Sequence, residues 1–106
     1  MIVTSWNNGK LSDSGAGYGL KIDENDRDQY FKKEWDNVEL QLINYPHIVE
    51  VNINKQSFWS GNCRELINKD IGIWLIENGL APWKKGQPPK LTMEPISKNR
   101  FLVKPI

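Results

Sequence analysis

Residues 37–54 place the strongest constraint on the fold, because apolar and polar side chains alternate along two runs there. In NVELQLINYPHIVEVNIN, Val38, Leu40 and Leu42 alternate with polar residues, and residues 49–53 repeat the pattern. The intervening NYPH carries a proline, which fixes φ, among residue types typical of turns. A period of two gives each strand one dry and one wet face, so this segment predicts an antiparallel hairpin.

Two further segments show the same period of two. YGLKI at 18–22 predicts a short strand with Leu20 and Ile22 on one side and Lys21 on the other. KLTMEPISKNRFLVKPI at 90–106 alternates on both sides of SKN and predicts a second hairpin. Prolines near the ends of that hairpin favour the edge of a sheet.

The remaining apolar residues follow a helical period. DENDRDQYFKKEW predicts a helix of about three turns over 23–35, with Asp23 as its N-cap. KQSFWSGNCRELINKDIGIWLIENGL predicts a helix pair over 55–80, interrupted at Gly61 and ended by Gly79.

Length and element order together predict one α+β domain over 1–106. We expect residues 1–19, rich in Gly, Ser and Asn, to form an N-terminal loop and residues 20–106 to form the core. The expected architecture is an antiparallel, barrel-like sheet of about five strands packed with two to three helices.

Composition narrows the class of protein further. A hydrophobic fraction of 39% and a charged fraction of 25% are ordinary for a soluble globular chain. No apolar run is long enough to span a bilayer, and the first residues lack a signal-peptide pattern. With a single cysteine, Cys63, no internal disulfide can form. We therefore expect a cytoplasmic protein that does not contact membranes.

The stretch SGAGYGLKI raises the question of a phosphate-binding loop. A dinucleotide fingerprint needs G-x-G-x-x-G at the start of a helix, and a Walker loop ends in G-K-[ST]. Here Gly15, Gly17 and Gly19 have a different spacing and lead into a strand. We interpret them as a structural bend that delivers Trp6 and Tyr18 to one end of the sheet.

The sequence predicts no catalytic residue, no metal site and no cofactor. The acidic run at 23–28 suits the first turn of a helix, and it lacks the glycine of a calcium loop. Cys63, near a predicted helix start, has no partner base, because nothing places it near His47. Glu39 and Glu50 face each other across the predicted hairpin on its polar side, where we expect them to be solvated.

Charge and aromatic content favour binding instead. The net charge is only +1, but residues 80–106 hold six basic side chains and one acidic one. Trp83 precedes Lys84 and Lys85, an arrangement that suits stacking on a base with cations on its phosphate. The same arrangement also suits a tryptophan that closes the end of the sheet beside solvated lysines. Trp35 and Trp74 lie on apolar stripes and are expected in the core.

The runs GAGYGLKI, VELQL, VNINKQSFW, IGIWL and GLAPWKKGQPP resemble small bacterial proteins encoded by integron gene cassettes. That resemblance implies a stand-alone bacterial domain and transfers no site. The element order, with KGQPPKLTMEP and RFLVK at its end, is similar to DNA-binding pseudobarrel domains. This second resemblance implies DNA held by loops and strands on one basic face.

The sequence thus predicts a non-enzymatic binding domain that contacts an anion or nucleic acid through its basic C-terminal segment. The first alternative is a small-molecule or protein-interaction module with a tryptophan-lined pocket, for which a homo-oligomer interface is one location. A hydrolase that uses Cys63 or a carboxylate pair is the third hypothesis. The candidate binding residues are Trp6, Tyr18, Trp59, Trp83, Lys84, Lys85, Lys90 and Arg100.

Overall fold

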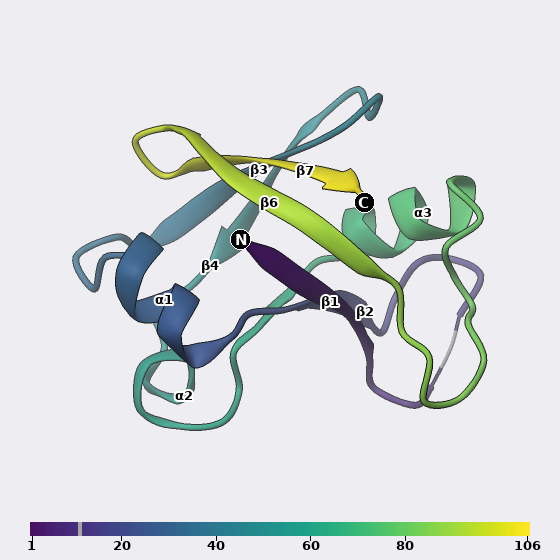
Figure 1. The fold of residues 1–106 in the computed structure, drawn as a ribbon, viewed down its shortest axis with the longest axis horizontal. Helices are drawn as coiled ribbons and strands as arrows, with labels where there is room; N and C mark the ends of the chain where they lie inside the picture. The colour runs from purple at the N-terminus through teal and green to yellow at the C-terminus, as the bar shows by residue number, and fades with distance from the viewer. Residues whose placement is uncertain (11) are drawn as a thin grey trace.

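The computed structural model describes residues 1–10 and 12–106, which form one seven-stranded sheet and three helices (Figure 1). The strands are β1 (Ile2–Asn7), β2 (Tyr18–Lys21), β3 (Asn37–Leu42), β4 (Ile48–Asn52), β5 (Glu65–Ile67), β6 (Lys90–Ser97) and β7 (Arg100–Pro105). The helices are α1 (Glu24–Tyr30), α2 (Gln56–Ser60) and α3 (Lys69–Glu77). The α+β class and both predicted hairpins are confirmed, but the sheet has seven strands rather than about five. The expectation that the C-terminal hairpin lies toward an edge is wrong, because β7 pairs with β3 and β6 pairs with β1, so both strands lie inside the sheet.

The strands follow the order β4-β3-β7-β6-β1-β2-β5, and neighbours pair antiparallel except for the parallel pair β3 and β7. The two outer strands approach each other, since Asn68 after β5 donates from Nδ2 to the Glu50 carbonyl of β4 at 3.2 Å. The sheet is therefore nearly closed and barrel-like. Figure 1 shows α1 and α2 at one end of it and α3 at the other. No helix in the described part of the chain is long and apolar enough to cross a membrane.

Aromatic packing fixes the end of the molecule that carries α1 and α2. Phe31, directly after α1, stacks on Phe101 of β7 with ring centroids 5.0 Å apart. Phe58 of α2 meets Phe31 edge-on at 5.7 Å, and Trp35 meets Phe101 edge-on at 6.4 Å. Full burial of such a side chain contributes roughly 2–3 kcal/mol, so this cluster anchors both short helices.

Strand β1 lies inside the segment 1–19, where the sequence analysis expected a loop. That expectation is wrong for residues 2–7, and also for residues 18 and 19, which belong to β2. Val3 and Ser5 face the interior, whereas Thr4 and Trp6 lie on the outer face, so few apolar residues mark the alternation. The segment is a strand because β2 and β6 pair with it on both sides.

Helix α1 begins as predicted but ends early. Asp23 is its N-cap, with the carboxylate accepting from the Asn25 amide at 3.1 Å. The prediction extended the helix to Trp35, yet it ends at Tyr30, and Phe31 has extended backbone. The reason is packing, because the Phe31 ring enters the aromatic cluster described above.

The predicted helix pair is interrupted by a strand. Gly61 ends α2, as expected, but residues 65–67 form β5, in which Leu66 is buried and Ile67 is exposed. The second helix starts later, with the Asn68 side chain accepting from a backbone amide as its N-cap. Cys63 therefore lies exposed before a strand, and the prediction that places it near a helix start is wrong.

The glycine-rich loop packs directly on α3. Gly15 and Gly17 have φ values of +91° and +87°, a region that favours glycine. A Cβ on Gly72 of α3 would lie 1.9 Å from the Gly15 carbonyl oxygen. The two backbones touch because neither residue has a side chain, which gives these glycines a structural role.

Alkaline unfolding offers a test of how α3 is held to the β3–β4 turn. Burial, then the hydrogen bond from the Tyr45 hydroxyl to Asp70 at 2.9 Å, raise the pKa of Tyr45 to about 12 from 10.0. The unfolded chain loses this proton first, so the stability that Tyr45 confers is intact below pH 10 and is lost toward pH 12. Urea midpoints should fall with pH over that window, and Tyr45→Phe should reduce the fall. An unchanged pH dependence in Tyr45→Phe would contradict the assignment.

Candidate functional site

The end of β1 and the loop at 83–89 enclose an open hollow of about 460 Å³, here named the tryptophan pocket. Its walls include Trp6, Asn7, Gly9, Trp83, Lys85 and Pro88. The volume lies within the range of small-molecule sites. Trp6 and Trp83, two of the predicted binding residues, thus line one hollow together with Lys85 of the predicted aromatic-cation segment.

Backbone contacts hold this pocket together. The Ser5 amide donates to the Pro89 carbonyl at 2.9 Å, which fastens the loop to β1. The Trp83 ring packs edge-on against Tyr18 at 5.8 Å, and Tyr18 is only 2% exposed. Burial, then the Asp13 carboxylate, raise the pKa of Tyr18, so it remains a neutral phenol. Tyr18 therefore supports Trp83 from behind rather than offering its own face to a ligand.

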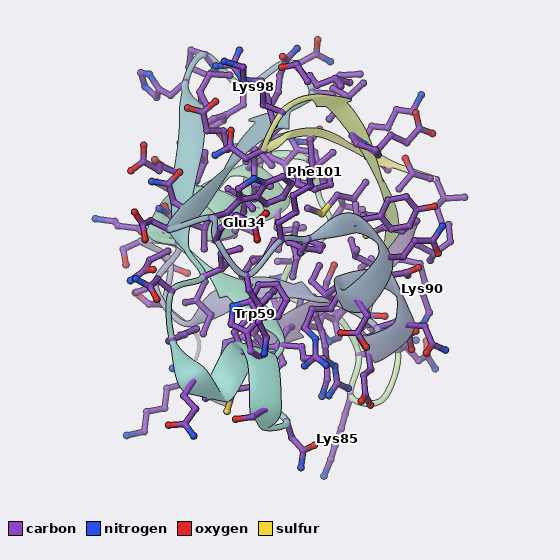
Figure 2. The ribbon with its side chains drawn as sticks, turned by 90° about the vertical axis from the view of Figure 1, so that its left-hand side faces the viewer. Glu34, Trp59, Lys85, Lys90, Lys98 and Phe101 are labelled. Carbon is purple, nitrogen blue, oxygen red and sulfur yellow. The ribbon has the colours of Figure 1, made fainter. Side chains whose placement is uncertain are left out.

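Both lysines of this loop are exposed to solvent, and Lys85 lines the pocket. The Gln87 amide donates to the Lys84 carbonyl at 2.9 Å, and Gly86 has a φ of +79°, so the chain turns tightly here. Lys84 and Lys85 are both exposed. Figure 2 shows Lys85 extending away from the body of the molecule. The pocket therefore combines half-buried indole rings with an exposed positive charge at its edge.

A second hollow of about 490 Å³, here named the lysine pocket, lies farther along β1. The residues around it include Thr4, Lys21, Asp23, Asp26, Arg64 and Lys90. Of these, only Lys90 was among the predicted binding residues. Lys21 was predicted on the polar face of its strand, but no pattern in the sequence indicates that β2 lies beside β1. Arg64 precedes the unpredicted strand β5, so it gave no signal either.

The other candidates serve the fold. Trp59 donates from Nε1 to the Ile53 carbonyl at 3.0 Å and lies beneath the Arg27 guanidinium, 5.9 Å from its ring centroid. Arg100 is paired, because its Nε and one terminal nitrogen each lie 3.0 Å from Oε1 of Glu39. Both residues therefore have structural partners outside the two pockets.

The basic residues after position 80 do not form one compact cluster, although the register places Lys90, Arg100 and Lys104 on the outer face of β6 and β7. Figure 2 places Lys98 and Lys85 at opposite ends of the molecule, with Lys90 at the side between them. Strand β6 is eight residues long, so basic residues before and after it lie at opposite ends of the molecule although they are close in sequence. The basic C-terminal segment is thus spread over separate parts of the surface.

The carboxylates that the sequence analysis considered for acid–base chemistry already have partners. Glu39 and Glu50 are opposite each other in the β3–β4 register, as expected. Glu39 holds Arg100, and Glu50 accepts from the Asn37 amide group at 3.2 Å. Within residues 1–10 and 12–106, no group of three or more His, Cys, Asp or Glu side chains is placed to hold a metal ion.

Comparison with known proteins identifies no relative of this chain, so a functional proposal has to be argued from the two pockets. No protein-family model, curated protein or solved structure matches the chain. The resemblances to integron-cassette proteins and to pseudobarrel domains stay predictions. Fold and site together describe a small α+β domain with an aromatic hollow and cations at its rim.

Proposed function

We propose that this domain is a non-enzymatic binding protein that takes a nucleotide unit, an aromatic base with its phosphate, into the tryptophan pocket. The observation that carries the proposal is the convergence of Trp6 and Trp83, from opposite ends of the chain, on one hollow with Lys85. Indole faces and ammonium groups together match a ligand that is flat and aromatic on one side and anionic on the other.

Each group has a distinct task in holding such a ligand. The half-buried rings of Trp6 and Trp83 stack on the base, a contact worth about 1–3 kcal/mol per base. Lys85 and Lys84 meet the phosphate as exposed point charges. Asn7 already accepts the Gly9 amide through Oδ1 at 2.9 Å, which leaves its NH₂ group to donate to a base carbonyl.

The lining favours binding over catalysis. The described side chains around the pocket are indole, amide, hydroxyl and ammonium groups together with proline and glycine. General acid–base chemistry at neutral pH uses histidine or carboxylate groups. The lining residues thus supply stacking, hydrogen bonding and positive charge, which are the means of recognition.

Titration with thymidine monophosphate tests the proposal. We expect quenching of tryptophan fluorescence and amide shifts around Gly9 and Gly86 in NMR spectra. Trp83→Ala should weaken binding about tenfold or more, because one stacking face is lost. Lys85→Gln should lower the slope of log affinity against log salt concentration by about one, the value for one lost phosphate contact, without affecting the fold.

Two control variants lie outside the pocket. Trp59→Phe keeps every pocket residue, and Lys98→Gln removes a cation at the opposite end of the molecule (Figure 2). Both should bind the monophosphate as the parent does. If uncharged thymidine binds as tightly as its monophosphate, the pocket belongs to the alternative class, a small-molecule module. If neither compound binds, the proposal is wrong.

A further inference from the structure

We infer, building on the proposed function, that the ligand is a single-stranded nucleic acid rather than a free nucleotide. The strand would run along the outer face of β1, from the tryptophan pocket into the lysine pocket. Residues of β1 line both hollows, with Trp6 at one and Thr4 at the other. Two adjacent hollows on one strand suit a polymer with repeating units better than a single small molecule.

The sheet register supplies the path between the two pockets. Thr4 is paired with Lys21 of β2 on one side and with Lys90 of β6 on the other. Directly paired residues share a face, so the two lysines flank Thr4 on the outer surface. Trp6 follows two residues later on the same face, roughly 7 Å along the strand. A chain that stacks on Trp6 therefore passes between the lysines at its next step.

The cations along this path are available to phosphate groups. Lys90 donates from Nζ to the Thr4 hydroxyl at 3.1 Å, which holds the ammonium over β1. Arg64 donates from Nε to the Ile22 carbonyl at 3.0 Å, and its terminal nitrogens have no hydrogen-bond or ion-pair partner among the described residues, so they can donate to a phosphate. Among the described residues, the ion pairs involve Arg27 and Arg100 instead.

Acidic side chains also lie near this path and limit its charge. Asp23 accepts the Asn25 amide as the cap of α1, and Asp26 lines the lysine pocket from the same helix. Glu65 is paired with Lys21 and is largely buried. These carboxylates offset part of the positive charge of the lysines and of Arg64. We therefore expect contacts with only a few phosphates and an affinity that salt weakens moderately.

The form of the tryptophan pocket favours a single strand over a duplex. A base can stack on an indole ring within a hollow only when its own faces are free of neighbouring bases. Bases in a duplex are already stacked and paired. A duplex would therefore present its phosphates but not the aromatic surface that this pocket accepts.

Length dependence of binding tests this inference. Fluorescence titrations would compare thymidine monophosphate, an octathymidylate single strand, and the same strand annealed to octaadenylate. We expect the octathymidylate to bind more tightly than the monophosphate and the duplex. Lys90→Gln and Lys21→Gln should each lower the salt slope of octathymidylate binding by about 0.7–1, and leave monophosphate affinity unchanged. Lys98→Gln should leave both unchanged.

The outcomes separate this inference from the proposed function. If the monophosphate binds as tightly as the octamer, or the duplex as tightly as the single strand, the inference is overturned and the nucleotide pocket stands. If Lys90→Gln and Lys21→Gln bind the octamer like the parent, the path through the lysine pocket is wrong. If no probe binds, the proposed function fails together with the inference.

Discussion

Gly72→Ala should cost about 3 kcal/mol or more of unfolding free energy, enough to prevent folding of a marginally stable domain. The added Cβ would lie 1.9 Å from the Gly15 carbonyl oxygen, which is backbone and not a flexible side chain. The loop cannot retreat easily, because the Asn8 amide donates to the Gly17 carbonyl at 2.9 Å. The Gly15 amide is also bonded, to the Ser12 carbonyl at 3.1 Å.

Gly79→Ala is the matched control for this substitution. Gly79 follows the same helix with a φ of +69°, and none of the described atoms lies within 4 Å of a Cβ placed there. Its substitution carries only the cost of a left-handed conformation, about 1 kcal/mol. Chemical denaturation of both variants measures the difference. Equal losses of stability would show that the contact between the glycine loop and α3 is looser than described.

The two hairpins could be predicted because their alternation is local and complete. Strands β1 and β5 could not, since their identity depends on partners elsewhere in the chain. β1 places only Val3 and Ser5 inward, and β5 has three residues, with Leu66 alone fully buried. In both cases pairing with β2 makes the strand, and a sequence pattern does not show which segments will pair.

The candidate site could be predicted in part. Trp6 and Trp83 stood out because each is a large aromatic residue in a polar, irregular stretch. Their convergence depends on the Ser5–Pro89 hydrogen bond and on the order of strands, which no spacing along the chain encodes. The prediction of one basic binding surface after position 80 failed for a related reason. The positive charges are close together in the sequence, but β6 and β7 distribute them over the length of the molecule.

Trp74→Ala, like Gly72→Ala, should be strongly destabilising, with an expected loss of about 3–5 kcal/mol of unfolding free energy. Trp74 is 1% exposed and fills the space between α3 and the sheet. Its Nε1 donates to the Ile43 carbonyl at 2.9 Å, at the end of β3. The substitution therefore opens a large cavity and also leaves a carbonyl without its donor, on the face of α3 that holds the hairpin.

Trp74→Phe separates these two contributions, because it keeps most of the ring and removes the donor. We expect a loss of about 1–3 kcal/mol, because the Ile43 carbonyl loses its indole donor next to a side chain that is only 1% exposed. Trp59→Phe removes an equivalent bond, from Nε1 to the Ile53 carbonyl at 3.0 Å, at a half-buried residue. Water can replace that donor, so the loss measured by urea denaturation should be smaller. If both phenylalanine variants lose the same stability, burial of the Trp74 bond contributes nothing, and packing alone holds α3 to the hairpin.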